Sequence, residues 1–351
     1  MEQSKSRSSQ RVWGKMVCSC MLLWLIPVYY LLRWFWELLK IDKLEKRAVL
    51  ITGCDSGFGF KTALQCSHAG IPTFAGCLTQ GGIDRLKKED SSSKLRPFLL
   101  DITKDESVAD AVKFVDANLK DGEFLWALVQ NAGVFTLYGP DDFMTAEHFQ
   151  FSFDVNCLGA IRVTHAFKRH IKNSKGRIIA TSSVSGRVAF PGTAAYAVAK
   201  YGVEAYMDAI RQELYPWGVQ CSILEPGAFK TPLLDHEMHR NRVNKAWEKL
   251  DAETKKEYGD SYKDFTIDSW NKALDGMASS NFSYVTDSYF HAITAQYPRK
   301  RYRCGWDSIF FYIPISLVPT EVQDWVFRML ITKENKNNVQ PACFSENNKN
   351  K

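Results

Sequence analysis

Short apolar runs alternate with longer amphipathic stretches along most of the chain, beginning near residue 48. Each apolar run has five or six residues and is bounded by turn residues, which is typical of parallel strands covered on both faces. The predicted strands are Ala48–Thr52, Thr73–Leu78, Leu95–Leu100, Leu125–Val129, Gly176–Thr181 and Val219–Leu224. Helix-length segments lie between them, including one that ends near Ala69, Asp105–Lys120, Thr145–Lys172 and Thr193–Tyr215. This alternation predicts an α/β fold, a doubly wound parallel sheet with helices on both faces.

The first 47 residues follow a different pattern and predict a membrane anchor. Residues 16–32 form an uncharged run of 17 positions, and Trp34-Phe35-Trp36 continue it beyond Arg33. The run spans about 26 Å, or about 32 Å through Trp36, against a hydrocarbon core of roughly 30 Å. A cleaved signal peptide would need small residues where aromatic ones stand, and a buried core helix remains an alternative. We expect an uncleaved N-terminal membrane helix.

The regular alternation ends beyond Thr231. Residues 235–275 combine charged and aromatic side chains at helical spacing, which fits either a lid over a substrate cleft or a solvated pair of helices. Residues 301–330 are largely apolar and predict a helical region that contacts substrate or membrane. Residues 333–351 are rich in Asn and Lys and predict a disordered tail. The expected organisation is an anchor (1–47), one α/β domain (48–332) and this tail.

Composition and charge narrow the classes of function. With 45% hydrophobic and 13% aromatic residues, the bulk of the chain cannot be intrinsically disordered. The formal charge of +6 belongs to the ends: residues 1–47 hold nine Lys/Arg against four Asp/Glu, and residues 333–351 hold four against two. The body between them is close to neutral, so we expect no nucleic-acid partner. The nine cysteines include no C-x-x-C pair, which indicates free thiols.

The first predicted strand leads into a glycine-rich turn and then a helix. The turn reads Thr52-Gly53-Cys54-Asp55-Ser56-Gly57-Phe58-Gly59. Such a turn presents backbone N–H groups and the positive end of a helix dipole to a pyrophosphate. Asp101 after the third strand could reach an adenine, and Asn131-Ala132-Gly133 end the fourth strand at the same edge. Together they predict a dinucleotide site in a sheet of the Rossmann type.

The turn also bears on the choice between NAD and NADP. The Asp55 carboxylate would repel a 2′-phosphate, and the only base near it in the turn is Lys61, which favours NAD. However, Cys77 ends the second strand, where an acidic residue would bind the ribose hydroxyls. NADP therefore remains the less favoured alternative.

Candidate catalytic groups follow the fifth strand. Tyr196 and Lys200 lie one helical turn apart, so the ammonium can lower the phenol pKa from its ordinary value near 10. Tyr196 could then take the proton of an alcohol while hydride passes to a nicotinamide. Ser183 could bind the reacting oxygen, and Asn156 could hold a water that links Lys200 to solvent. The pair His236 and His239 has the wrong spacing for zinc, so no metal is expected.

This set of motifs resembles the short-chain dehydrogenase/reductase family over residues 48 to about 330. The family's glycine motif matches Thr52–Gly59 and its N-A-G matches Asn131–Gly133, with Gln130 departing from the usual preceding Asn. The resemblance implies a catalytic set of Asn156, Ser183, Tyr196 and Lys200, the last two also touching the cofactor. Pro226, Gly227 and Thr231 are similar to the family's segment that contacts the nicotinamide carboxamide.

Within the family, the chain is most similar to the retinol and hydroxysteroid dehydrogenases. The similarity rests on the glycine turn, Cys77-Leu78-Thr79, Arg301-Tyr302 and Gly305-Trp306-Asp307. It implies NAD-dependent oxidation of a lipophilic alcohol, retinol or a hydroxysteroid, at the endoplasmic reticulum membrane or alternatively a mitochondrial one, and leaves room for a homodimer. Two alternatives are a dehydrogenase of a soluble hydroxy acid such as 3-hydroxybutyrate and a non-catalytic NAD-binding protein.

Overall fold

The structure is a computed structural model that describes residues 27–334 and 339–347 of the 351-residue chain. The chain divides into two compact units, each described by itself. The smaller unit comprises Met1–Asp42 with Thr294–Pro298, and the larger comprises Lys43–Ile293 with Arg299–Lys351.

In the smaller unit, residues 27–37 form a helix that is followed by a short paired segment. Lys40 forms an antiparallel bridge with Ala295, and the Gln296 N–H donates to the Leu39 carbonyl oxygen over 2.7 Å. The first part of the predicted anchor, up to residue 26, lies outside the described residues. Within the part of the chain that the structure describes, no helix is both long and apolar enough to cross a bilayer.

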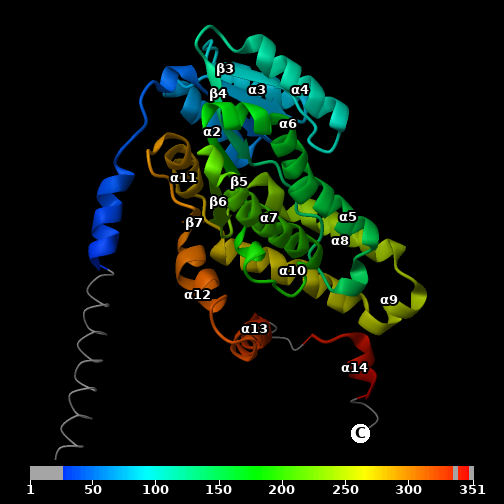
Figure 1. Cartoon of the computed structure of the whole chain (residues 1–351). Coiled ribbons are helices and arrows are strands. Elements are labelled where there is room, and N and C mark those ends of the chain that lie inside the picture. Colours follow the sequence, from blue (N-terminus) through cyan, green and yellow to red (C-terminus); the bar gives the residue numbers. More distant parts are fainter. Residues whose placement is uncertain (1–26, 335–338, 348–351) are drawn as a thin grey trace, which may run out of the picture. The chain divides into compact units, whose positions relative to one another are not determined.

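The larger unit is built on a parallel sheet of seven strands (Figure 1). The strands are β1 (Arg47–Thr52), β2 (Thr73–Cys77), β3 (Leu95–Leu99), β4 (Phe124–Gln130), β5 (Arg177–Thr181), β6 (Gln220–Pro226) and β7 (Arg301–Cys304). Their order is β3-β2-β1-β4-β5-β6-β7. The order reverses between β1 and β4, and ligands of such sheets bind at the carboxyl ends of the strands beside this point.

The doubly wound parallel sheet is thus confirmed, and the missing element in the prediction is β7. Arg301–Cys304 was assigned to a helical region because its exposed and buried residues alternate, as they do on an edge strand, instead of forming an apolar run. The strand pairs in parallel with β6 over four residues, from Ile223 opposite Arg301 to Pro226 opposite Cys304. This pairing places residues 301–307 beside the carboxyl end of β6.

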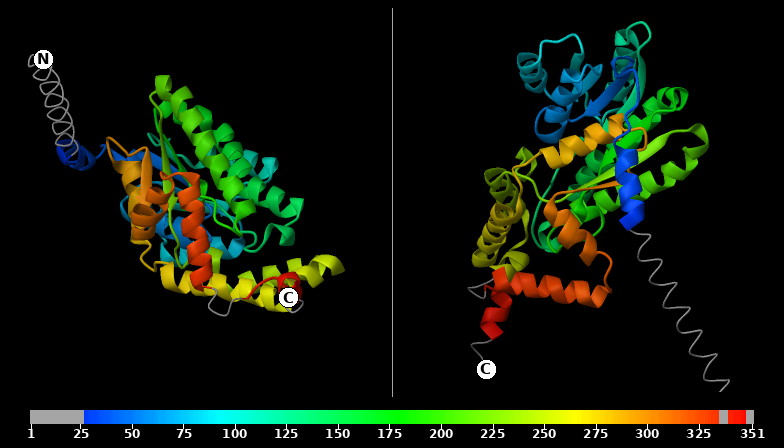
Figure 2. Two further views of the ribbon diagram at one scale, coloured as in Figure 1. Left: turned by 90° about the horizontal axis from the view of Figure 1, so that it is seen from below. Right: turned by 90° about the vertical axis from the view of Figure 1, so that its left-hand side faces the viewer.

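Helices cover both faces of the sheet. α2 (Gly57–His68) and α11 (Ser283–Thr294) lie on one face, and α4 (Asp105–Asn118), α6 (Gly159–Ser174) and α7 (Ala194–Glu213) on the other (Figures 1 and 2). α3 (Gln80–Glu89) connects β2 to β3. The main core joins the second group of helices to the strands, with Val108, Phe167 and Met207 among its buried side chains.

A second, smaller core lies under the predicted lid region. The segment 235–275 forms α8 (His236–Lys249), α9 (Ala252–Tyr258) and most of α10 (Asp260–Met277). Val243, Trp247 and Ile267 from these helices are buried against Leu137 and Phe143. The helices are therefore packed onto the domain and are not merely solvated, while their role as a lid stays a prediction.

The C-terminal region is helical after β7. It contains α12 (Ile313–Ile315), α13 (Thr320–Glu334) and α14 (Ala342–Asn347). Among the described residues, the predicted tail (333–351) includes the end of α13 and α14, and its disorder stays a prediction. The seven cysteines that the structure describes are free, and six of them are buried.

Candidate active site

The glycine turn forms a close-packed cradle between β1 and α2. Gly53 and Gly57 have φ angles of +70° and +62°, which side chains other than glycine's rarely tolerate. A Cβ on Gly59 would lie 2.4 Å from both the Asn131 Nδ2 atom and the Gly53 carbonyl oxygen. Asn131 closes the turn because its Nδ2 donates to the carbonyl oxygens of Thr52 (3.0 Å) and Gly53 (2.9 Å). A turn held open this way, at the N-terminus of α2, fits a pyrophosphate.

Asp55 of the glycine turn reaches the end of β2. Its carboxylate accepts hydrogen bonds from the backbone N–H of Leu78 (2.7 Å) and of Thr79 (2.9 Å), directly after β2. The glycine turn therefore brings a carboxylate to the end of β2, where the sequence has Cys77. Arg85 of α3 donates to the Asp55 carbonyl oxygen over 2.6 Å, a nearby cation that sequence reasoning missed.

A cavity of about 600 Å³ extends from this turn along the carboxyl ends of the strands. Most predicted site residues line it: Gly53, Asp55, Ser56, Gly57, Phe58, Asp101, Asn131, Ala132, Gly133, Asn156, Ser183, Tyr196, Lys200, Pro226, Gly227 and Thr231. Thr52 and Gly59 do not line it. The Thr52 hydroxyl oxygen instead accepts hydrogen bonds from the backbone N–H groups of Asn131 and Ala132, each over 3.1 Å. It therefore fixes the position of two residues that line the cavity.

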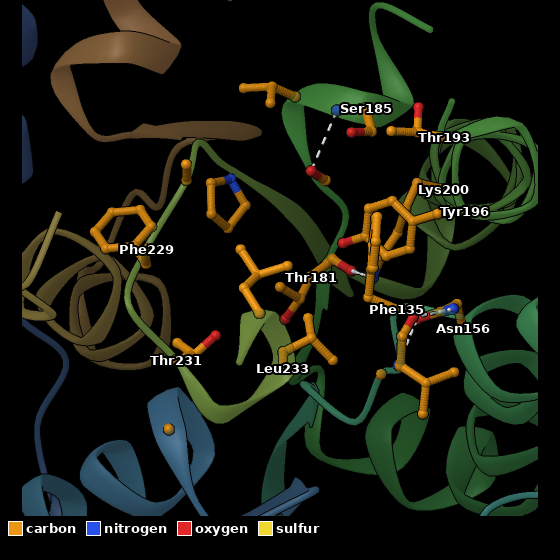
Figure 3. Close-up of a pocket in the computed structure, with 18 of the residues that line it drawn as sticks. Phe135, Asn156, Thr181, Ser185, Thr193, Tyr196, Lys200, Phe229, Thr231 and Leu233 are labelled. Carbon is orange, nitrogen blue, oxygen red and sulfur yellow. Dashed lines mark hydrogen bonds between the residues drawn. The ribbon is translucent and has the colours of Figure 1, made fainter. Parts of the chain in front are cut away.

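The catalytic candidates meet near the middle of the cavity (Figure 3). Tyr196 and Lys200 lie next to each other on α7, with the Lys200 Nζ atom 5.5 Å from the centre of the Tyr196 ring. Lys200 Nζ also donates to the Thr181 carbonyl oxygen over 2.9 Å, which fixes it to the end of β5. Ser183 follows two residues later and is 8% exposed. The side chains that could bind and deprotonate an alcohol are therefore assembled at one place.

Burial changes the pKa values of this pair in a way that the spacing alone did not predict. Burial raises the pKa of Tyr196 to about 12, although a hydrogen bond with Ser183 lowers it. Burial lowers the pKa of Lys200 to about 8, although Cys157 and Glu204 raise it. In the protein alone, desolvation thus outweighs the lowering by Ser183, and the lowering expected from Lys200 stays a prediction.

Asn156 lies on a π-helical turn, Asp154–Leu158, between α5 (Ala146–Phe153) and α6. Its amide is used by the protein itself: Nδ2 donates to the carbonyl oxygens of Val134 and Ser152 over 2.9 Å each, and Oδ1 accepts the Val134 N–H over 3.0 Å. The single helix predicted over Thr145–Lys172 therefore contains a π-helical turn at the candidate residue, as functional sites often do. A water-holding role for Asn156 stays a prediction.

The loop after β6 is held by Asp307 of the Gly305-Trp306-Asp307 motif. The Asp307 carboxylate accepts the Ala228 N–H over 2.7 Å and the Ser308 N–H over 2.8 Å. A Cβ on Gly227 would lie 2.0 Å from a carboxylate oxygen of Asp307, so the loop needs glycine there. The motif therefore fixes the segment that carries Pro226, Gly227 and Thr231.

Sequence reasoning missed several residues at the site. Tyr289 of α11 is fully buried and contacts the Thr181 hydroxyl, and its OH donates to the Asn131 Oδ1 atom over 3.2 Å. The far end of the cavity is lined by aromatic and aliphatic side chains from separate segments: Phe135, Tyr138, Phe190, Leu233, Leu234, Trp270, Leu274, Met277, Phe327, Leu330 and Ile331. Trp270, Leu274, Phe327 and Leu330 lie in the segments 235–275 and 301–330 that were expected near the substrate, but no spacing rule singled out the individual residues.

Comparisons with known proteins agree with this geometry. The model of the short chain dehydrogenase family matches residues 47–242, more than half of the chain. The chain belongs to the short-chain dehydrogenase family. It is 40% identical to the 3beta-hydroxysteroid dehydrogenase dhs-16 of Caenorhabditis elegans, with 93% of this chain and 87% of that protein covered. It is 39% identical to retinol dehydrogenase 7 of Rattus norvegicus, with 87% and 95% covered.

The fold itself has a counterpart among solved structures. A short-chain dehydrogenase from Streptomyces avermitilis superposes with a TM-score of 0.63 at 22% sequence identity, covering 82% of this chain and 98% of that one. Short-chain dehydrogenases are oxidoreductases that bind a nicotinamide nucleotide, and the glycine cradle and the cavity beside it have room for that group. Within the family the chain falls in the retinol and hydroxysteroid dehydrogenase branch.

Proposed function

We propose that this short-chain dehydrogenase oxidises a lipophilic alcohol, a retinoid or a hydroxysteroid, with NAD at a membrane surface. The observation that carries the proposal is the cavity itself. One end is the glycine cradle, the middle holds Tyr196 and Lys200, and the far end is apolar. Of the residues that line it, only Lys200 carries a positive charge.

The charge of the lining distinguishes between two substrate classes. A hydroxy acid such as 3-hydroxybutyrate needs an Arg or Lys that pairs with its carboxylate. Lys200 donates to the Thr181 carbonyl oxygen beside the reacting groups, and none of the described residues that line the apolar end is an Arg or Lys. An apolar wall instead suits the hydrocarbon body of a retinoid or steroid, as in other small-molecule pockets.

The side chains support a simple proton transfer. When bound, the nicotinamide nucleotide supplies the hydride acceptor and a positively charged ring. Ser183 donates a hydrogen bond to the alcohol oxygen, and Tyr196 accepts the hydroxyl proton. Because burial raises the Tyr196 pKa to about 12, the phenol needs positive charge near it to lose its own proton to solvent and act as the phenolate that accepts the alcohol proton. Lys200 supplies this charge only while it is protonated.

This requirement defines an expected pH profile. Burial lowers the Lys200 pKa to about 8, so the ammonium is neutralised as the pH rises through that value. We expect kcat to rise with pH while Tyr196 becomes easier to deprotonate, and to fall above about pH 8. Constant activity from pH 8 to pH 10 would contradict the role of Lys200.

The preference for NAD follows from the position of Asp55. The carboxylate accepts hydrogen bonds from Leu78 and Thr79 at the end of β2, where it can bind ribose hydroxyls and where a 2′-phosphate would be repelled. Arg85 lies beside it but contacts the Asp55 backbone. The balance of the two charges makes NAD the favoured cofactor.

Membrane association is supported by two regions. One is the uncharged run at 16–32, which is long enough for an anchor. The other is α13, whose Val322, Trp325 and Met329 are 42%, 63% and 48% exposed at helical spacing, while Phe327 and Leu330 of the same helix line the cavity. An apolar outer surface beside an apolar cavity wall would let a substrate enter from lipid.

One turnover screen tests the proposal. The full chain in detergent is assayed with retinol, with 3α-, 3β- and 17β-hydroxysteroids and with 3-hydroxybutyrate, each with NAD and with NADP. We expect NADH formation with at least one retinoid or steroid and none with 3-hydroxybutyrate. Activity confined to 3-hydroxybutyrate would contradict the substrate class. NAD binding without turnover of any alcohol would point to a non-catalytic protein.

A further inference from the structure

The buried face of α7 continues beyond the catalytic pair. Tyr196, Lys200 and Glu204 follow one another at intervals of four residues, so they lie on one face of the helix. Their exposed fractions are 9%, 3% and 6%. A carboxylate so deeply buried one turn from a buried ammonium needs a physical reason, because burial of either charge alone is costly.

An arginine from the edge strand holds this carboxylate. Arg301 of β7 contacts Glu204 through Nη1, and the same atom donates to Glu225 of β6 over 2.8 Å. Arg301 Nη2 donates to Asp208 of α7 over 2.5 Å. The guanidinium thus ties α7 to the two last strands, and Glu204 cannot turn away from the helix face that it shares with Lys200.

Packing beside the active site restricts the same group. The Ser182 hydroxyl donates to the Lys200 carbonyl oxygen over 3.4 Å. A Cβ on Gly186 would lie 2.9 Å from the Lys200 carbonyl oxygen and 3.0 Å from Glu204 Cγ. Ser182 directly precedes the catalytic Ser183, so Glu204 is packed against the segment that positions it.

The charges around the two groups are nearly balanced. The groups that face Glu204 are Lys200, Tyr201 and Asp208 from α7, Glu225 from β6 and Arg301 from β7. Arg187 pairs with Glu225, and Cys157 of the π-helical turn faces Lys200. Among the described groups that act on the Lys200 charge, Glu204 is the only carboxylate. It therefore supplies the negative charge that favours the ammonium form.

We propose that Glu204, held in place by Arg301, is a positioning residue: it keeps Lys200 charged and so sets the pH range of the reaction. The inference rests on the proposed function. Arg301 thus acts on the active site indirectly: it holds Glu204 in place and does not contact the substrate.

The test compares pH profiles of the full-length wild type and Glu204→Gln. Removal of a negative charge disfavours the Lys200 ammonium and favours the Tyr196 phenolate, so both pKa values fall. We expect both limbs of the kcat/KM profile to move to lower pH by about one unit, which is about a tenfold loss of activity at pH 9. Because Arg301 keeps Asp208 and Glu225 as partners, the variant leaves no unpaired cation and should fold.

Two control variants separate charge from packing. Asp208→Asn removes a carboxylate from the same arginine at a half-exposed position, and its limbs should move by less than about 0.3 units. Glu204→Asp keeps the charge and should keep the wild-type limbs even if its maximum rate falls. If Glu204→Gln is slower at every pH and the limbs of its profile do not move, the proposal is overturned. If Glu204→Gln does not fold, the proposal is overturned when the limbs of the Glu204→Asp profile move.

A second readout does not depend on the substrate. Lys200 lines the cavity, so NAD affinity measured by calorimetry should decrease as this residue loses its charge. The midpoint of that decrease should lie about one pH unit lower in Glu204→Gln. A wild type that binds NAD but oxidises no alcohol contradicts the proposed function alone, whereas an unmoved binding midpoint contradicts the role of Glu204.

Discussion

The two ends of the cavity are built from different parts of the chain. At the cofactor end the wall includes the backbone of the glycine turn: Gly53 and Gly57 line the cavity with positive φ, and Gly59 behind them has no room for a Cβ. At the substrate end the wall consists of large side chains such as Trp270 and Phe327, which come from segments far apart in the sequence. A backbone wall tolerates almost no added atoms, whereas a wall of apolar side chains can change shape without loss of the fold.

The largest expected effect lies where the two ends meet. Tyr196→Phe removes the hydroxyl that we propose accepts the alcohol proton, while it leaves the ring in place. We expect kcat to fall about a thousandfold and the Kd for NAD to change less than about twofold. Absorbance of NADH and calorimetry measure the two quantities. Tyr215→Phe, at a position 79% exposed, is the control and should behave as wild type. Retained turnover in Tyr196→Phe would exclude the mechanism.

A smaller effect should be confined to the cofactor end. In Gly59→Ala the added Cβ would lie 2.4 Å from the Asn131 Nδ2 atom and the Gly53 carbonyl oxygen, so the turn must move. At about 2 kcal/mol, the cost corresponds to roughly thirtyfold in the Kd for NAD. Gly276→Ala is the matched control, because a Cβ there meets nothing within 4 Å. Unchanged NAD affinity in Gly59→Ala would show that the turn is not the cofactor site.

The same contrast explains what the sequence could and could not predict. The cofactor end was predictable because backbone conformation restricts residue type: the glycines and Asn131 are the residues that such a turn permits. The proximity of Tyr196 and Lys200 was predictable because a helix relates them by a fixed spacing, while their catalytic roles stay predictions. Six of the seven strands followed from their apolar runs, while β7, a half-exposed edge strand, did not.

The remaining contacts depend on tertiary structure. Nothing in the sequence near Asp55 shows that its carboxylate reaches Thr79, because that contact joins residues 24 positions apart. Tyr289 and Asn131 are 158 positions apart. The pKa of Tyr196 also could not be predicted from spacing, since desolvation depends on every neighbour that excludes water.

Cofactor selection offers a sharper test of the cofactor end. Asp55→Asn removes the charge that would repel a 2′-phosphate and leaves Arg85 beside the same position. We expect the ratio of kcat/KM for NAD to that for NADP to fall about tenfold, a change of about 1.4 kcal/mol. The double variant Asp55→Asn, Arg85→Met should lose most of the gain with NADP. An unchanged ratio in the single variant would mean that Asp55 does not select the cofactor.

The smallest expected effect belongs to the substrate end. Phe327 of α13 lines the cavity, is 9% exposed and packs edge-on against Phe190 with ring centres 5.2 Å apart. Phe327→Ala removes part of an apolar wall that neighbouring side chains can partly replace, so we expect a loss of about 1 kcal/mol, seen as a fivefold higher KM for the alcohol. NAD affinity should not change. Trp325→Ala, on the same helix but 63% exposed and outside the cavity lining, should keep the wild-type KM in detergent. If Phe327→Ala weakened NAD binding instead, the two ends of the cavity would not be separable, and the contrast between a backbone wall and a side-chain wall would fail.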